Sequence, residues 1–194
     1  MPPDETDLRA LCEAGDHDAA MTAAVQRYGR ELFGFLLGLS GDHDRAGDAF
    51  SAMCERAWTA LPKFRWDSSL RVWLYTIARH EFLRAVRRDR RNLPLSVAPS
   101  VAEAVAVIRT ATAAHQRTEI KAAFAKVREA LAPEDHMLLG LRLDRRLAWN
   151  EIATILGDGD PAHLGRDAAV LRKRYQRLKA RLQELSAQLL PDRE

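Results

Sequence analysis

Residues 66–91 read WDSSLRVWLYTIARHEFLRAVRRDRR, and the rest of the chain is best interpreted outward from them. Asp67, Ser68 and Ser69 offer short side-chain oxygens that can cap the free N–H groups at the start of a helix. Neither proline nor glycine follows within the segment, so nothing in it interrupts a helical backbone. We therefore expect one long helix that begins after this cap and continues to the end of the segment.

The two halves of this expected helix differ in composition. The first half is aliphatic and aromatic, with Leu70, Val72, Trp73, Leu74, Tyr75 and Ile77. The last turns carry five arginines against the single Asp89, namely Arg84, Arg87, Arg88, Arg90 and Arg91. This pattern suits a partner that offers both stacking faces and phosphates. A core helix with a solvated basic end has the same pattern, so this segment alone leaves both interpretations open.

Helical periodicity also dominates the residues before this segment. One apolar face contains Ala24, Val25, Tyr28, Leu32, Phe35, Leu36 and Leu39. After a break at Ser40-Gly41-Asp42, a second face contains Ala46, Ala49, Phe50, Met53, Ala57 and Leu61, and Pro62 ends that helix. The following loop sets Phe64 and Trp66 among cations. Residues 1–92 are thus predicted to form an all-helical domain.

The composition changes after this domain. Residues 92–100, NLPLSVAPS, contain two prolines and no charge, which indicates the start of a linker that we extend over residues 93–118. Residues 101–115 are rich in alanine, valine and threonine, and their pattern fits a weak helix or a partly ordered tether equally well. Helical patterning resumes with Ile120, Phe124, Val127 and Leu131.

Residues 119–194 are predicted to form a second helical domain with a helix-turn-helix. Pro133 opens one helix, with Met137, Leu138, Leu141 and Leu143 as its apolar residues. A second helix over about 148–156 turns Ile152, Ala153 and Leu156 inward and stops at Gly157, a common residue after a helix end. A turn-rich insert follows over 158–165.

The last expected helix runs from about Asp167 to Leu189. Its apolar stripe contains Leu171, Tyr175, Leu178, Leu182, Leu185 and Leu189. At 100° per residue, four polar residues point away from this stripe, with Arg172 on its flank: Arg166, Lys173, Gln176 and Arg177. The second helix of a helix-turn-helix enters the DNA major groove, and a cationic N-terminal half suits that role. A basic helical hairpin with solvated lysines and arginines is the alternative.

Composition excludes several classes of protein. The chain has 194 residues, 47% hydrophobic and 29% charged, with a net charge of +3, which is typical of a globular protein. The acidic N-terminus has no apolar run, and no segment approaches the length of a membrane span, so we expect a cytoplasmic protein without membrane insertion. Cys12 and Cys54 are far apart, which argues against a disulfide framework or a zinc site.

The sequence also lacks the usual signatures of catalysis. It has no glycine-rich phosphate loop, no helical histidine pair around a glutamate and no nucleophile elbow. Its six histidines are not paired at a ligand spacing. We therefore expect no catalytic residue, no cofactor and no metal site, and the protein is predicted not to be an enzyme.

The order of these motifs resembles that of bacterial extracytoplasmic-function sigma factors, a compact two-domain group of RNA polymerase subunits. Residues 36–48, LLGLSGDHDRAGD, are similar to the helix pair of the family's first domain. Residues 67–91, with WLYTIAR at 73–79, are similar to its promoter-melting segment. Residues 131–157, followed by RYQR at 174–177, resemble its second domain.

The resemblance implies partners and site residues. The partners would be core RNA polymerase, promoter DNA and an anti-sigma factor. The −10 element would be bound by Phe64, Arg65, Trp66, Ser68, Trp73, Arg79, His80, Arg87, Arg88 and Arg91. The −35 element would be read by Arg166, Arg172, Lys173, Gln176 and Arg177, and core polymerase would be bound by Asp48, Ser51, Glu55 and Arg56. His80 stands where the family usually has asparagine, and an imidazole can still hydrogen-bond a base edge.

Two other functions remain open at this point. A stand-alone helix-turn-helix regulator would bind duplex DNA unaided, usually as a dimer, and the long C-terminal stripe could form its dimer interface. A helical DNA-processing enzyme would need a nucleophile or a carboxylate metal cluster, and the sequence shows neither.

Overall fold

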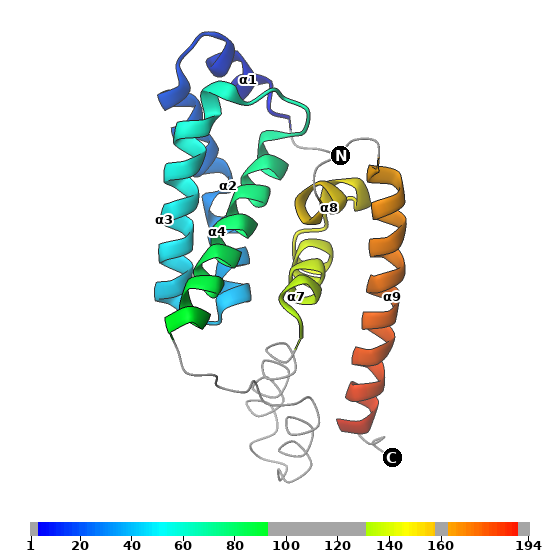
Figure 1. Cartoon of the computed structure of the whole chain (residues 1–194). Helices are drawn as coiled ribbons and strands as arrows, with labels where there is room; N and C mark the ends of the chain where they lie inside the picture. Colours follow the sequence, from blue (N-terminus) through cyan, green and yellow to red (C-terminus); the bar gives the residue numbers. More distant parts are fainter. Residues whose placement is uncertain (1–3, 93–130, 158–162, 190–194) are drawn as a thin grey trace.

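The computed structural model describes residues 4–92, 131–157 and 163–189, and every regular element within these ranges is helical (Figure 1). The first unit contains α1 (Thr6–Glu13), α2 (His17–Ser40), α3 (His43–Ala60) and α4 (Leu70–Asn92). The second unit contains α7 (Pro133–Leu139), α8 (Trp149–Leu156) and α9 (Leu164–Leu189). The all-α prediction is confirmed, while the predicted linker lies outside the described residues.

Local chemistry explains where the helices of the first unit begin and end. The Asp16 side chain accepts a hydrogen bond from the Ala19 N–H at 3.0 Å, and Asp42 accepts one from Arg45 at 2.9 Å, so each aspartate caps the helix that follows it. Between α2 and α3, Gly41 has a left-handed backbone with φ of 66°. The predicted break and recap at these residues is confirmed.

The core of the first unit lies where α2, α3 and α4 pack against one another. Its largest fully buried side chains include Leu32, Met53, Leu74 and Tyr75. Removing one such aliphatic or aromatic side chain from water contributes roughly 1.5–3 kcal/mol to stability. Of the two interpretations that the sequence leaves open for α4, the core one therefore holds for its aromatic first half, and only part of one of its faces is left for a partner.

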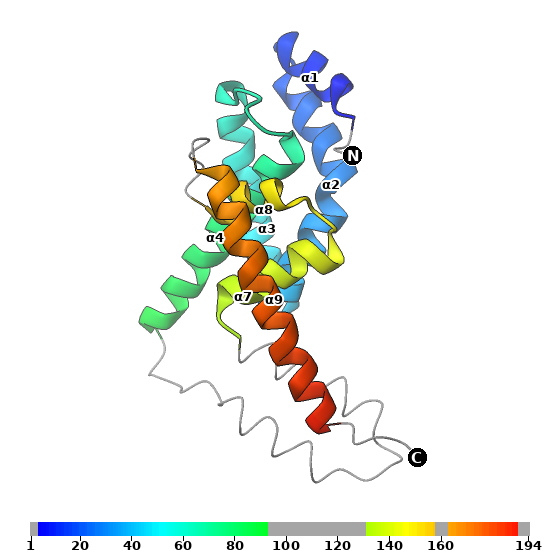
Figure 2. The same ribbon diagram turned by 90° about the vertical axis from the view of Figure 1, so that its right-hand side faces the viewer.

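The second unit packs directly onto the first one. Helix α8 lies against α4, and α9 lies on the outer side of α7 and α8 (Figures 1 and 2). One continuous cluster of buried side chains joins the two units, and the second unit contributes Met137, Leu138, Leu141, Leu147, Ile152 and Ile155 to it. The described residues thus form two helical units with a shared core.

Arg145 extends this contact from the turn between α7 and α8. Its guanidinium lies so close to α2 that a Cβ added at Gly34 would meet Nη2 at 2.8 Å. The Arg145 side chain also lies near the buried Tyr75 of α4. Within the described residues, the Tyr75 hydroxyl and the Arg145 Nε both lack a hydrogen-bond partner. Glycine at position 34 therefore provides the space in which the second unit approaches the first.

Two details of the second unit go beyond what its sequence predicts. Leu143, one of the four apolar residues named for the helix that Pro133 opens, is 55% exposed, because α7 ends in a π turn, Gly140–Asp144, which changes the register of the side chains. The helix stops at Gly157, as predicted, and this glycine has an extended backbone with φ of −86°. Glycine is still required there, because a Cβ would meet the Ala153 carbonyl oxygen at 2.6 Å.

The start of α8 lacks an ordinary side-chain cap, because its N-cap residue is Ala148. The methyl group of Ala148 cannot accept a hydrogen bond from the backbone. Only the reciprocal contact forms, in which the Glu151 carboxylate accepts the Ala148 N–H at 2.7 Å. Replacing a hydroxyl cap by alanine costs about 1 kcal/mol, and the packing of Ile152 and Ile155 into the shared core offsets this loss.

Candidate nucleic-acid interface

Three aromatic side chains meet beside the start of α4. The ring centroids of Phe64 and Trp66 are 5.0 Å apart, and those of Phe64 and Trp73 are 4.8 Å apart. All three rings are half-buried, so each keeps part of its surface in water. The structure therefore brings together three residues that the sequence assigned to one site, two from the loop and one from the helix.

Trp66 has an unusual backbone conformation. Its φ is 60°, in the left-handed region that a bulky residue rarely adopts. The guanidinium of Arg9 lies over its ring, 5.8 Å from the centroid. Tertiary contacts hold the loop in a conformation that its local sequence does not favour.

The cap of α4 differs from the expected one. Ser69 accepts a hydrogen bond from the Val72 N–H at 3.2 Å, as a capping residue would, but Asp67 instead pairs with Arg65 at 3.1 Å. The first two N–H groups of the helix, those of Leu70 and Arg71, donate to the carboxylate of Glu5, 2.6 and 2.9 Å away. The N-terminal segment thus supplies a cap that sequence analysis did not find.

Helix α4 carries a polar stripe beyond the aromatic cluster. Trp73, His80, Arg84 and Arg87 share one side of the helix, and the last three are exposed. Although His80 is mainly exposed, partial desolvation of its imidazole, reinforced by the nearby Arg79, lowers its pKa, which favours the neutral imidazole. This form can both donate and accept a hydrogen bond, as a base edge requires.

The remaining cations predicted for this site lie in different surroundings. Arg79 is half-buried on the flank of the stripe, one residue around the helix from His80. Arg88 is exposed and lines a groove between α3 and α4, on the side of the residues predicted to bind polymerase. The side chain of Arg91 lies outside the described residues.

This groove has a volume of about 670 Å³ and contains charges of both signs. Asp48, Ser51 and Glu55 form its α3 side, so three of the four predicted polymerase-binding residues lie together. The fourth, Arg56, approaches the groove residue Glu81 at 3.6 Å. Sequence analysis missed Glu81, which is 8% exposed although it carries a carboxylate.

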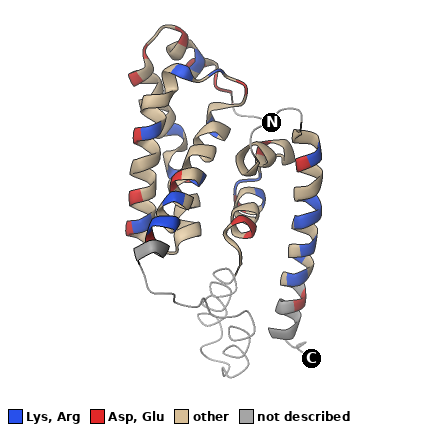
Figure 3. Cartoon of the chain, in the orientation of Figure 1, with Lys and Arg blue, Asp and Glu red and all other residues tan. Residues whose placement is uncertain are grey.

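The second unit presents cations along α9 (Figure 3). The side chains of Arg166, Lys173, Gln176 and Arg177 are all exposed. On the flank of the helix, Arg172 lies over the Trp149 ring, 5.7 Å from its centroid.

The opposite side of α9 packs inward, as the apolar stripe predicted. Leu178 is 6% exposed, and Leu171 and Tyr175 pack against the core. Arg174 makes a contact within the protein instead: its Nε donates a hydrogen bond of 2.5 Å to Asp135 at the start of α7.

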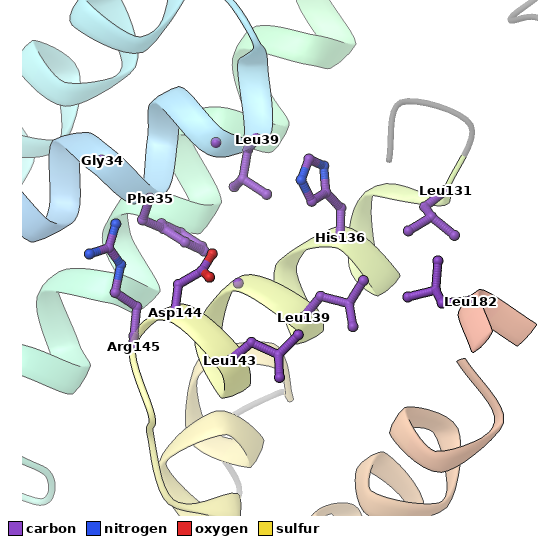
Figure 4. A pocket seen from close by; sticks show the side chains of 12 residues that line it. Gly34, Phe35, Leu39, Leu131, His136, Leu139, Leu143, Asp144, Arg145 and Leu182 are labelled. Carbon is purple, nitrogen blue, oxygen red and sulfur yellow. The ribbon is translucent and has the colours of Figure 1, made fainter. Parts of the chain in front are cut away.

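Two hollows lie between the two units. An apolar pocket of about 140 Å³ is enclosed by Phe35 and Leu39 of α2 and by Leu139, Leu143 and Arg145 of the second unit (Figure 4). A more open, polar cleft of about 570 Å³ contains Ser68 of the aromatic loop and Glu151 of α8. The predicted base-binding loop therefore faces the second unit across this cleft.

Other chemistry is not apparent in the part of the chain that the structure describes. Among those residues, no group of three histidine, cysteine, aspartate or glutamate side chains could hold a metal ion. Cys12 and Cys54 are both free thiols. None of the described helices is long and apolar enough to cross a membrane.

Comparison with known proteins agrees with this geometry. The family described as Sigma-70 region 2 matches residues 24–92, which contain most of α2 and all of α3 and α4. These residues are a sigma-70 region 2 domain. The region 2 domain thus includes the aromatic cluster and the groove between α3 and α4, while α1 precedes the matched residues.

Individual relatives extend the similarity beyond the region 2 domain. RNA polymerase sigma factor YlaC of Bacillus subtilis (strain 168) is 26% identical over 141 residues, which cover 73% of this chain and 82% of the relative. Sigma factor RpoE of Bartonella quintana, solved in complex with the anti-sigma factor NepR, matches with a TM-score of 0.60 and 22% identity. That match covers 89% of this chain and 98% of the other, and it shows a common fold. The predicted relation to sigma factors is confirmed.

Proposed function

We propose that the protein is a promoter-specificity subunit that binds core RNA polymerase and starts transcription at promoters with −10 and −35 elements. The observation that carries this proposal is the aromatic cluster of Phe64, Trp66 and Trp73 inside a sigma-70 region 2 domain. Such a subunit captures and positions DNA without making or breaking covalent bonds, so the protein would not be an enzyme. It would work in the cytoplasm, where RNA polymerase and DNA are.

The aromatic loop would capture a base of the −10 element after it leaves the DNA stack. Extruding a base costs a few kcal/mol, and stacking on an aromatic side chain returns about 1–3 kcal/mol. Phe64 and Trp66 supply the stacking surface, and Arg65, Ser68 and His80 supply polar contacts. Arg79, Arg87 and Arg91 would bind the neighbouring phosphates.

Helix α9 would read the −35 element in the major groove. Lys173 and Gln176 are the best candidates for base edges, because both are exposed on the side of α9 opposite its packed stripe. Arg166 and Arg177 would contact phosphates, and Arg172 would lie at the edge of the contact, where Trp149 holds it.

Core polymerase would occupy the groove between α3 and α4. A helix with charges of both signs fits it best, because the groove sets Asp48 and Glu55 against Arg84 and Arg88. Arg88 was predicted to bind the −10 element, and it also lines this groove. We therefore propose that Arg88 contacts both polymerase and the end of the −10 element. Asp48→Lys should weaken core binding without changing the affinity of the isolated chain for DNA.

The two units would have to separate before both promoter elements are bound. Elements about 25 base pairs apart are separated by about 85 Å along the duplex, whereas α8 lies directly against α4. Residues 93–130 could bridge such a distance, since a fully extended chain advances about 3.3–3.6 Å per residue. The packed arrangement is then a resting form of the free subunit, and we propose that an anti-sigma factor also binds the chain, as NepR binds its structural neighbour.

The stand-alone regulator is less compatible with the fold. Its dimer would require the apolar stripe of α9, but Leu171, Tyr175 and Leu178 are used within the chain, against α7 and α8. A dimer built on that stripe would have to unpack the second unit first.

Reconstitution with polymerase tests the proposal. The purified chain should bind core RNA polymerase of its own organism and direct run-off transcription from specific sites on genomic fragments. A chain that binds duplex DNA tightly but never binds core polymerase would instead support the regulator. Metal-dependent cleavage of DNA would contradict both.

A further inference from the structure

Helix α1 belongs to neither of the DNA-binding surfaces described above, and it precedes the residues that match region 2. It nevertheless touches the −10 loop at two points. Glu5, the residue before α1, accepts hydrogen bonds from the first N–H groups of α4, and the Arg9 guanidinium of α1 lies over the ring of Trp66. Neither contact can be predicted from the sequence of the loop itself, because Glu5 and Arg9 lie about 60 residues before it in the chain.

The Glu5 contact is buried and fully hydrogen-bonded. The side chain is 8% exposed, and its two carboxylate oxygens accept the Leu70 and Arg71 N–H groups as well as the Tyr28 hydroxyl, 2.9 Å away. A carboxylate at a helix N-terminus satisfies unpaired donors and interacts favourably with the helix dipole. Burial and the adjacent Glu5 raise the pKa of Tyr28, which therefore stays a donor.

The position of α1 is fixed independently of the loop. Arg27 of α2 bonds the Asp7 side chain and the Asp4 backbone carbonyl, and Leu8 is fully buried in the core. Arg9 is bonded to Glu13 one turn further along α1, at 2.9 Å. Both contacts with the loop therefore start from a rigid support.

The loop needs such a support. Trp66 has a left-handed φ of 60°, a conformation of high energy for a bulky residue. Without tertiary contacts, the loop would adopt another conformation. A cation over the ring and a fixed first turn of α4 restrict the indole to one position beside Phe64 and Trp73. A site held in this way loses less conformational entropy when it binds a base.

We propose that α1 is a positioning element of the −10 interface, in which Glu5 sets the start of α4 and Arg9 holds Trp66 in place to receive an unpaired base. This inference rests on the proposed function. Neither residue needs to touch DNA. Their effect on base capture acts through the loop, and it is separate from polymerase binding at the groove between α3 and α4.

The test uses holoenzyme made from core polymerase and the full chain, and a single-stranded oligonucleotide with the −10 sequence of a promoter that the wild-type holoenzyme transcribes. An abasic site is moved along the oligonucleotide. The position where it weakens wild-type binding most identifies the captured base. The ratio of the affinity for the intact strand to the affinity for the abasic strand then measures base capture apart from phosphate contacts. A merely structural change would lower both affinities and leave this ratio unchanged.

Four variants separate the possible results. Glu5→Gln should reduce this ratio about 10-fold, and Arg9→Gln about 2–5-fold, as expected for one exposed cation–π contact. Arg9→Lys keeps a cation and should stay within 2-fold of wild type. Asp4→Asn changes an exposed neighbour that bonds only Thr6 through its side chain, and it should have no effect.

Two results would overturn the inference. One is an unchanged ratio in both Glu5→Gln and Arg9→Gln; the other is an equal loss of affinity for intact and abasic strands, which would indicate general damage to the fold. A wild-type holoenzyme that transcribes but has no abasic-sensitive position would refute base capture itself, and this inference with it. A chain that never binds polymerase would instead refute the proposed function.

Discussion

Phe64 packs against Trp66 in the loop and against Trp73 of α4, and Arg9 of α1 lies over Trp66, whereas Lys173, Gln176 and Arg177 are exposed along one side of α9. The first surface depends on contacts between residues about 60 positions apart in the chain, such as Glu5 with Leu70. The second needs only a helix with a packed stripe on its other side.

The difference suits the two kinds of DNA that we propose they bind. A base outside its stack presents an aromatic face and has no fixed position, so its site must be preorganised in three dimensions. Duplex DNA is already ordered, and a regular helix with cations at helical spacing fits its major groove. Changes in the aromatic site should therefore be large and confined to strand opening, while changes on α9 should be smaller and sensitive to salt.

The largest effect is expected from Trp66→Ala. Losing one stacking surface worth about 1–3 kcal/mol should slow open-complex formation by roughly 5–150-fold. Core polymerase binding should not change, because the groove between α3 and α4 is untouched. Permanganate footprinting of a transcribed promoter measures the opening, and Trp58→Phe on the exposed side of α3 serves as the control. Normal melting by Trp66→Ala would remove the loop from the −10 site.

On α9, Lys173→Ala or Arg177→Ala should weaken binding to a −35 duplex by several-fold. A lost phosphate contact should also lower the slope of log affinity against log salt by about one. The matched control is Arg174→Ala on the same helix, since Arg174 bonds Asp135 within the protein. It should reduce thermal stability and leave the salt slope unchanged. Equal salt slopes for all three variants would show that this part of α9 does not bind the −35 element.

A smaller effect should come from Gly34 of α2, which lies against Arg145 where the two units meet. Gly38→Ala, where a new Cβ meets no atom within 4 Å, should stabilise α2 by about 0.5–1 kcal/mol. Gly34→Ala should give less, because its Cβ displaces the Arg145 guanidinium. Denaturant unfolding of both variants compares them directly. Equal gains would show that Arg145 contributes nothing to the contact between the units.

The smallest effect concerns pH. The pKa of His80 is lower in the folded chain than its ordinary value, so the unfolded chain takes up this proton first. Stability should therefore fall as the pH drops below about 6.5, the ordinary pKa of histidine, until the folded chain is also protonated. His80→Gln should flatten this part of the curve in urea unfolding between pH 7.5 and 5.5. Parallel curves for the two proteins would contradict the prediction.

Much of the fold follows from local pattern. The helices over 17–40, 43–60 and 70–92 were expected from apolar spacing and from breaks at Gly41 and Pro62, and the structure confirms them. Helix α1 was missed because Leu8 and Leu11 are its main apolar residues and its partners lie in α2 and α4. The exposure of Leu143 could not be predicted, because one π turn shifts the side chains away from a periodicity of 3.6 residues.

The candidate site shows the same division. Helical spacing was enough to find the exposed cations of α9, whereas Asp48, Ser51 and Glu55, which share one groove, were predicted from the resemblance to sigma factors. It could not find Glu5, Arg9 or Glu81, because each acts on a residue brought near by the tertiary fold. Nor could it show that α8 packs on α4, since an apolar face does not identify the face that will cover it.

The continuous core that joins the two units bears on how the protein survives in the cell. Elements that share one core unfold together, so a calorimeter should record a single endotherm for the free chain. Moving the units apart would return Met137, Leu141 and Ile152 to water and leave two smaller bundles, each with less buried surface to hold it. The separated units would then depend on polymerase and DNA, which stabilise whatever folded form they bind, for the stability that the shared core gives the free chain.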